Sequence, residues 1–236
     1  MTTEIETYLN SLPEDILTID IRCKGLTSLP DLTRFKNLTK LDCSDNQLTS
    51  LPTLPQNLEK LSCFNNQLTS LPTLPQNLKE LDCSNNQLIS LPTLQENLKI
   101  LYCSVNKLTY LPTLPQNLKE LDCSVNQLNF LPTLPQNLKE LYCYNNQLTY
   151  LPTLPQNLEI LSCFKNQLTS LPTLPQNLKE LYCHGNPIYE IVYNDSLFQI
   201  KKNIQILNNF RYLYYCLQLK KQLRKWLWEK VRENPK

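Results

Sequence analysis

The chain has 236 residues, a formal net charge of +2 and only two glycines, at positions 25 and 185. Two glycines exclude a glycine-rich phosphate loop and a dinucleotide-binding fingerprint, because each motif needs several at fixed offsets. The N-terminus has neither a basic start nor an apolar run, and no segment reaches the roughly 18 apolar residues of a membrane span. With ten cysteines and no secretion signal, the chain is expected in the cytoplasm, without stable membrane insertion.

Residues 1–15 are predicted to form a short N-terminal helix. Ile5, Tyr8, Leu9 and Leu12 have helical apolar spacing, and Pro13 follows as a helix-ending residue. Terminal units of a stacked repeat must present a polar outside. We therefore expect this helix to cap the first repeat.

Residues 16–188 repeat one phrase, Leu-x-x-Leu-x-Cys-x-x-Asn-x-Leu-x-x-Leu-Pro. Its cysteine recurs every 20 residues, at Cys43, Cys63, Cys83, Cys103, Cys123, Cys143, Cys163 and Cys183. A fixed period of this length predicts a solenoid of small stacked coils. The first coil, residues 16–37, has 22 residues; seven coils of 20 residues follow, and a partial coil begins at Leu178.

Within one coil, residues 40–44 alternate with period two, which predicts a strand with Leu41 and Cys43 pointing inward. Its copies are expected to pair in parallel, about 4.8 Å apart. The repeated asparagine, Asn46 in this coil, is expected to satisfy backbone groups at the turn. Pro52 and Pro55 predict an extended, polyproline-like return limb without a helix.

This phrase resembles the leucine-rich repeat superfamily. It is most similar to the 20-residue Leu-Pro-rich subclass of secreted bacterial effectors and giant DNA virus repeat proteins. The resemblance covers residues 16–188 and implies a parallel sheet on a concave face that binds other macromolecules. The ending, residues 226–233, is similar to the tails of giant-virus proteins. Together these resemblances imply a viral protein that engages a host or viral protein in the host cytoplasm.

Residues 189–236 differ from the repeats and predict two helices, over 196–210 and 212–233. This segment carries ten Lys/Arg against four Asp/Glu, and a basic C-terminal cap is the expected role. One alternative is association with a membrane surface or an anionic partner. The side chains that suit it are Lys220, Lys221, Arg224, Lys225, Trp226 and Trp228. Nucleic-acid binding is not expected, because the concave sheet is acidic.

No catalytic residue, metal site or cofactor is predicted. The cysteine spacing of 20 is unlike the close pairs of zinc sites, and His184 is the single histidine. The repeated cysteines are interpreted as small buried hydrophobes, with redox sensing as the alternative. An effector-type adaptor or enzyme would need the tail to act, but Cys216 lacks the neighbouring acid that such a nucleophile uses.

The outward strand positions vary while the rest of the coil barely changes. Aromatic side chains gather there in the last three coils, which predicts a protein-binding patch rimmed by Glu140 and Glu180. Its members are Tyr142, Tyr144, Ile160, Phe164, Tyr182 and His184, with Tyr102 and Phe64 as further candidates on the same face. The alternative is that cross-strand aromatic pairs only stabilise the sheet, or that the C-terminal helices cover them. The sequence thus predicts a monomeric, non-enzymatic protein-binding scaffold.

Overall fold

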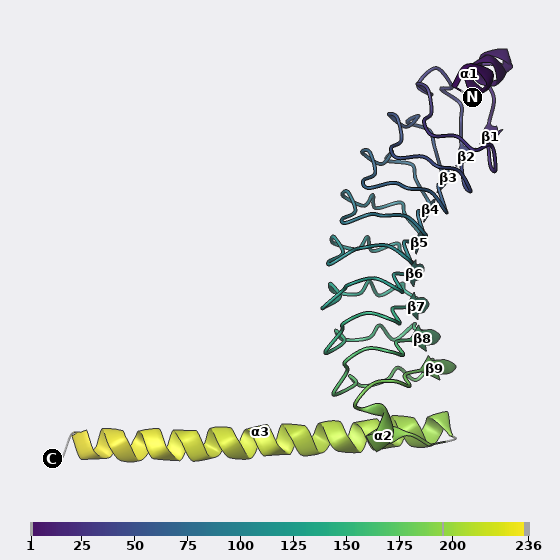
Figure 1. Ribbon diagram of the computed structural model, residues 1–236. Coiled ribbons are helices and arrows are strands. Elements are labelled where there is room, and N and C mark those ends of the chain that lie inside the picture. The colour runs from purple at the N-terminus through teal and green to yellow at the C-terminus, as the bar shows by residue number, and fades with distance from the viewer. Residues whose placement is uncertain (1, 195, 234–236) are drawn as a thin grey trace.

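The chain forms one curved solenoid with a helix at each end (Figure 1). The computed structural model describes residues 2–194 and 196–233, apart from the side chains of 2–4, 214, 217, 218 and 226–233. Helix α1 spans Thr2–Ser11, α2 spans Tyr189–Val192 and α3 spans Leu197–Glu233. The strands between them are β1 (Thr18–Asp20), β2 (Lys40–Asp42), β3 (Lys60–Ser62), β4 (Glu80–Asp82), β5 (Ile100–Tyr102), β6 (Glu120–Asp122), β7 (Glu140–Tyr142), β8 (Ile160–Ser162) and β9 (Glu180–Tyr182).

The strands form one parallel sheet in chain order, β1 to β9. Each strand pairs with its copy in the next coil, so that Leu41 lies beside Leu61. Backbone bonding continues past the regular strand, since the Cys43 N–H donates to the Ser62 carbonyl at 2.9 Å. The predicted parallel solenoid is confirmed. The regular strand is shorter than the predicted residues 40–44, because Asp45 turns the chain with a φ of 55°.

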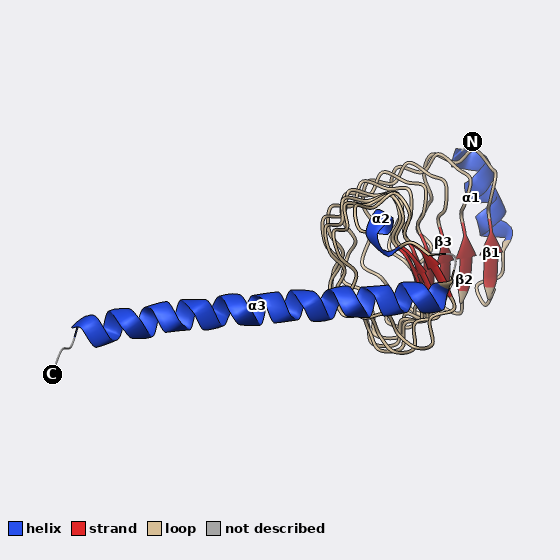
Figure 2. Ribbon diagram, turned by 90° about the horizontal axis from the view of Figure 1, so that it is seen from below, coloured by secondary structure: helices blue, strands red, loops and turns tan. Residues whose placement is uncertain are grey.

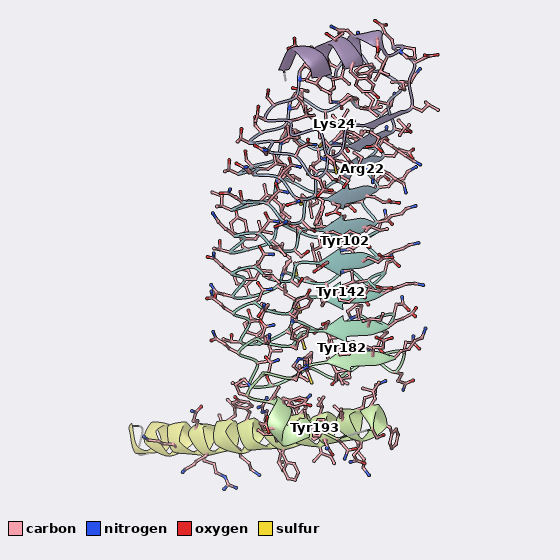
Figure 3. All side chains as sticks on the ribbon, turned by 45° about the vertical axis from the view of Figure 1, so that its right-hand side comes forward. Arg22, Lys24, Tyr102, Tyr142, Tyr182 and Tyr193 are labelled. Atoms are coloured by element: carbon pink, nitrogen blue, oxygen red, sulfur yellow. The ribbon has the colours of Figure 1, made fainter. Side chains whose placement is uncertain are left out.

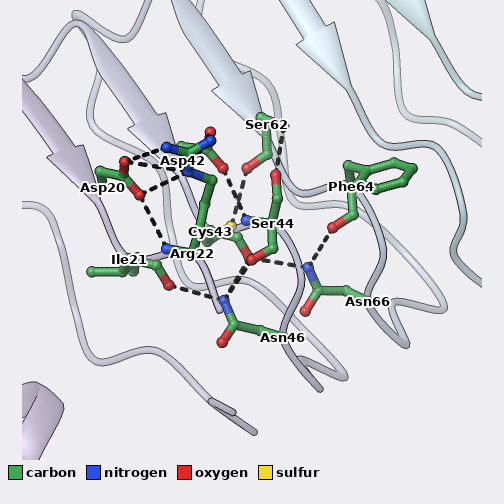
Figure 4. A network of polar contacts seen from close by, with 10 residues as sticks. All are labelled: Asp20, Ile21, Arg22, Asp42, Cys43, Ser44, Asn46, Ser62, Phe64 and Asn66. Atoms are coloured by element: carbon green, nitrogen blue, oxygen red, sulfur yellow. Dashed lines mark hydrogen bonds and ion pairs between the residues drawn. The ribbon is translucent and has the colours of Figure 1, made fainter. Parts of the chain in front are cut away.

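The repeated asparagine ties neighbouring coils together. Asn66 Oδ1 accepts from the Leu48 N–H of the preceding coil at 2.9 Å. Its Nδ2 donates to the carbonyls of Cys43 at 3.1 Å and Phe64 at 3.2 Å, which Figure 4 shows. It also donates to the Cys63 carbonyl at 3.1 Å. The same pattern recurs to Asn186. The predicted role of this amide is confirmed, and no buried side-chain N or O atom in the described residues lacks a partner.

The eight repeated cysteines lie in the core, each at most 3% exposed. The Cys43 thiol donates to the Ser62 carbonyl of the next coil at 3.4 Å. Burial raises the pKa of Cys43 to about 12 and that of Cys183 to about 11. Cys23 and Cys216 are exposed. The prediction of buried, hydrophobe-like thiols is therefore confirmed.

The return limb of each coil is extended and closes with a tight turn, in which the Leu58 N–H donates to the Pro55 carbonyl at 3.2 Å. At the N-terminal end, α1 buries Ile5 and Leu9 against the first coil, and the Arg34 guanidinium donates to the Leu9 carbonyl. The helix ends at Ser11, four residues before the predicted limit.

The C-terminal segment corrects one prediction, because the expected break between helices 196–210 and 212–233 is wrong. Helix α3 runs without interruption from Leu197 to Glu233. Residues 210–212 are Phe-Arg-Tyr, and without proline or glycine nothing interrupts the helical hydrogen bonds. In the part of the chain that the structure describes, no helix is both long and apolar enough to cross a bilayer.

Only the first part of α3 packs on the solenoid. Ile204 is 2% exposed, the Lys201 ammonium donates to the Leu178 carbonyl at 3.0 Å, and the Asn208 amide donates to the Leu171 carbonyl at 3.1 Å. From Phe210 to Lys225 every described side chain is exposed, and Figure 2 shows the helix extending well past the stack. The Trp226 and Trp228 side chains, which the membrane-surface alternative needs, lie outside the described residues.

Replacing Asn66 with Ala should lower the free energy of unfolding by about 3 kcal/mol or more. The change leaves the Leu48 N–H buried without a partner, at about 1–3 kcal/mol. It also removes one of two hydrogen bonds from each of the Cys43, Cys63 and Phe64 carbonyls, at about 1 kcal/mol for each bond. Urea denaturation measures the effect. The exposed neighbour provides the control, since Gln67→Ala should change stability by about 0.5 kcal/mol or less. Equal losses in the two variants would contradict the role of the amide.

The buried thiols should make the fold sensitive to alkali. A raised pKa favours the neutral thiol in the native state, so stability is intact well below the ordinary thiol pKa of about 9 and falls as pH rises through it. Above that pH, each buried thiol should lower the free energy of unfolding by about 1.4 kcal/mol for every pH unit. Urea titrations between about pH 8 and about pH 10 measure the slope.

A double variant tests this explanation. Cys83→Ala with Cys103→Ala should reduce the slope by about twice the single-thiol amount, because burial raises both pKa values. The exposed pair, Cys23→Ala with Cys216→Ala, should leave the slope unchanged. An unchanged slope in the buried pair would show that other groups cause the alkaline sensitivity.

Candidate protein-binding surface on the concave sheet

The in-register sheet arranges its outward side chains in rows along the concave face. The third residue of each strand forms one such row, in which Tyr102 lies beside Asp122 and Asp122 beside Tyr142. The row continues through Ser162 to Tyr182. Figure 3 shows Tyr102, Tyr142 and Tyr182 in succession along this face. The C-terminal half of the sheet therefore presents a tyrosine on every second strand.

These tyrosines border a shallow, open hollow of about 500 Å³. It is lined by Tyr102, Asp122, Tyr142, Tyr144, Ser162, Phe164 and Tyr182. The structure thus brings together four members of the predicted patch and adds Tyr102, which the sequence marked only as a further candidate. Asp122 and Ser162 were missed, although their alternation with the tyrosines in one row was visible in the sequence.

The other predicted residues lie outside the hollow. Ile160 is half-buried in the row between Glu140 and Glu180. His184 is exposed at the C-terminal end of the sheet. Phe64 is 37% exposed beside β3 and lines neither this hollow nor the one in the N-terminal half. The structure therefore separates Phe64 from the aromatic patch.

The patch is less exposed than the sequence predicted, because its rings pack on one another. Tyr144 stacks on Phe164 with ring centroids 4.4 Å apart, and Phe164 stacks on His184 at 4.6 Å. Tyr189 of α2 contacts His184 edge-on at 6.4 Å. Tyr144 and Phe164 are half-buried, whereas Tyr182 is 47% exposed. Cross-strand stacking, the alternative to an interface, does occur among Tyr144, Phe164 and His184.

Carboxylates hold the tyrosine ring positions. The hydroxyl of Tyr102 donates to Glu120 at 2.7 Å, that of Tyr142 to Glu140 at 2.9 Å, and that of Tyr182 to Glu180 at 2.9 Å. Burial, and then the hydrogen bond to Glu140, raises the pKa of Tyr142 to about 12. The phenols therefore remain neutral donors at neutral pH, and the carboxylates accept from them.

The N-terminal half of the concave face has a different character. Its hollow, of about 460 Å³, is lined mainly by paired charges and apolar strand residues. Arg22 contacts Asp20 at 2.8 Å and Asp42 at 3.5 Å, and Lys60 contacts Glu80 at 2.6 Å. These opposite charges pair with one another, whereas Lys40 and Asp82, which also line the hollow, form no ion pair among the described residues. Among the described residues, no group of three or more His, Cys, Asp or Glu side chains is arranged to hold a metal ion.

Comparison with known proteins gave matches to leucine-rich repeat models over parts of the solenoid. A family model described as "Leucine Rich repeats (2 copies)" matches residues 56–96, and one described as "Leucine Rich Repeat" matches residues 37–58 and 137–158. A search of curated proteins found no match to this sequence.

Three similar solved structures are bacterial effectors or effector domains. YopM from Yersinia pestis is 41% identical, with a TM-score of 0.68 over 72% of this chain and 49% of YopM. YopM from Yersinia enterocolitica WA-314 is 34% identical, with a TM-score of 0.56 over 75% of this chain and 48% of that protein. A Shigella effector LRR domain is 32% identical, with a TM-score of 0.62 over 71% of this chain and 76% of the domain. The chain thus spans about half the length of either YopM.

Phe164→Ala should lower the free energy of unfolding by about 2 kcal/mol. The substitution removes the middle ring of the three-ring stack and leaves a gap beside Tyr144. Chemical denaturation measures the loss, with Ser162→Ala on the same coil as a small-side-chain reference. A Phe164→Ala variant as stable as the parent would show that the stack contributes nothing to folding.

Proposed function

This chain belongs to the leucine-rich repeat family, and we propose that it is a non-catalytic scaffold that binds another protein in the aromatic hollow of its concave sheet. Proteins of this family are generally protein-binding scaffolds. The observation that carries the proposal is the aromatic hollow lined by Tyr102, Tyr142 and Tyr182 on the concave face. Tyrosine-rich patches of this kind are enriched at protein interfaces.

The mechanism is binding to a surface that is already ordered. The hydrogen bonds from Tyr102 and Tyr142 to glutamates and the stack of Tyr144 on Phe164 position the rings before a partner arrives. A partner therefore loses little free energy to the ordering of this side of the interface. The burial of each side chain decides its role in this proposal. Tyr144 and Phe164 support the hollow, while Tyr142 and the more exposed Tyr182 contact the partner.

The partner in this proposal is a host-cell protein. The similarity to YopM, described as a leucine-rich effector protein, and to the Shigella effector domain supports this choice. We propose that the chain acts as a monomer in the host cytoplasm. The viral source and the Leu-Pro-rich subclass, suggested by the repeat phrase and the tail, stay predictions.

The two alternatives place the activity in the C-terminal segment. An effector-type enzyme would use Cys216, which is exposed on the projecting part of α3. Membrane-surface association would use exposed basic residues such as Lys220 and Lys221, together with the two tryptophans. Neither alternative makes use of the aromatic hollow, and the concave face therefore remains our proposal.

The proposal is tested with a displayed library of random peptides selected on the parent protein. Selected peptides should lose about thirtyfold or more in affinity for a Tyr142→Ala, Tyr182→Ala double variant. Central aromatic anchors each contribute about 2 kcal/mol or more, which corresponds to this factor. Fluorescence polarisation gives the affinities, and urea denaturation checks that the variant remains folded.

The control changes the same row in the N-terminal half. A Ser62→Ala, Asp82→Ala double variant should bind the selected peptides nearly as tightly as the parent. Peptides that bind the tyrosine double variant as well as the parent would show that the aromatic hollow is structural and that the partner site lies elsewhere.

A further inference from the structure

The aromatic hollow lies in a part of the concave face that has negative charge and no positive charge of its own. From β5 to β9, the outward rows described above carry four carboxylates and no lysine or arginine. These carboxylates are Glu120, Asp122, Glu140 and Glu180. In the N-terminal half, by contrast, Arg22 and Lys60 neutralise their neighbours. Lysines close to these strands in sequence, such as Lys119, Lys139 and Lys165, do not line the hollow.

Asp122 is the one carboxylate in the lining of the hollow, and its orientation is set by its own coil. Oδ1 accepts from the Ser124 N–H at 3.0 Å and from the Ser124 hydroxyl at 2.6 Å. Within the described residues, the structure gives Oδ2 no hydrogen-bond donor. One oxygen of Asp122 is thus left to accept from a ligand.

Two tyrosines flank this carboxylate at a spacing that suits a cation. Tyr102, Asp122 and Tyr142 stand on consecutive strands in register, which places the two tyrosines about 9.6 Å apart along the sheet. Both rings turn their hydroxyls toward the glutamate row. The Tyr102 hydroxyl reaches Glu120 on β6, the strand of Asp122, so the Tyr102 ring leans toward Asp122, whereas the Tyr142 hydroxyl bonds to Glu140 on its own strand. A cation held by Asp122 would lie beside these rings, and cation–π attraction extends to about 6 Å from a ring centroid.

We propose that Tyr102, Asp122 and Tyr142 form a slot for an arginine side chain of the protein partner. This inference rests on the proposed function and specifies the chemistry of its partner. The guanidinium donates to Asp122 and lies between the tyrosine rings. Arginine suits the slot better than lysine, because a planar, weakly hydrated guanidinium combines a carboxylate hydrogen bond with stacking on aromatic faces. Glu120 and Glu140 add attraction at the rim.

The probe is an acetylated peptide of repeated Gly-Arg units, and its matched control replaces every arginine with citrulline. Citrulline keeps the shape of the side chain but has no charge. The arginine peptide should bind the parent at least about tenfold more tightly, since a charged hydrogen bond and a cation–π contact are both lost in the control. Its binding should weaken as salt is added.

Asp122→Asn is the decisive variant. It should weaken binding of the arginine peptide by at least about tenfold, because it removes the charge and keeps an acceptor oxygen for Ser124. Asp82→Asn is the matched control, because Asp82 occupies the same row and accepts from the Ser84 N–H at 3.0 Å. It should change binding by less than about twofold. Circular dichroism and urea denaturation establish that both variants are folded.

Equal binding of the citrulline peptide, or equal losses in Asp82→Asn and Asp122→Asn, would overturn the arginine slot. The arginine slot can fail without contradicting the proposed function. Library-selected peptides that require Tyr142 and Tyr182 but are indifferent to Asp122→Asn would also overturn the slot, while the concave protein-binding site would stand. Peptides that depend on Asp122 and contain an arginine at a fixed position support both.

Discussion

Parallel pairing in strict register is the constraint on which the whole molecule depends. Every strand residue lies beside its copy one coil away, as Leu41 lies beside Leu61. Leucines and cysteines therefore form continuous columns in the core. The buried turn needs a donor and an acceptor in every coil, and the carboxamide of Asn66 and its copies supplies both to neighbouring coils. A single repeated residue thus solves the same hydrogen-bonding problem along the entire solenoid.

The same register places like side chains together on the surface, and the variable positions compensate for this. Glu120 lies beside Glu140 in the sheet, an unfavourable pair of like charges. Each of them accepts a hydrogen bond from a tyrosine hydroxyl. Next to the strands, Glu159 lies between Lys139 and Lys179 and contacts both ammonium groups. Hydrogen bonds from tyrosines and ion pairs with lysines therefore limit the repulsion. In a separate row, the alternation of Tyr102, Asp122 and Tyr142 sets the tyrosine spacing of the hollow.

The return limb and the concave face of the solenoid have different roles. The return limb is built from leucine and proline and changes little from coil to coil, whereas the residues of the concave rows vary among the coils. Charge pairs occupy the N-terminal half of the concave face, and aromatic rings over an unpaired carboxylate occupy the C-terminal half. Helix α3 covers the last coil with its first turns and leaves this face open. Specificity can therefore vary without any change in the core.

The sequence by itself determined the solenoid, the parallel register, the buried cysteines, the asparagine bridges and the extended return limb. A period of 20 residues encodes all of these, because each depends only on equivalent positions meeting one coil apart. The sequence also identified most of the residues that line the hollow, because strand alternation determines which side chains point outward.

Tertiary structure decided the rest. Tyr144 and Phe164 are half-buried because their rings stack on each other. The strand pattern predicts that both side chains point outward, but it does not specify how the rings turn. Val105 adopts a left-handed φ of 53° against its β-branched preference, because the turn of every coil imposes it. Helix α3 is continuous because no breaker interrupts it, although its apolar spacing suggested two helices. Ring stacking between coils and the repeated turn thus outweighed the local preference of the sequence at Phe164 and Val105.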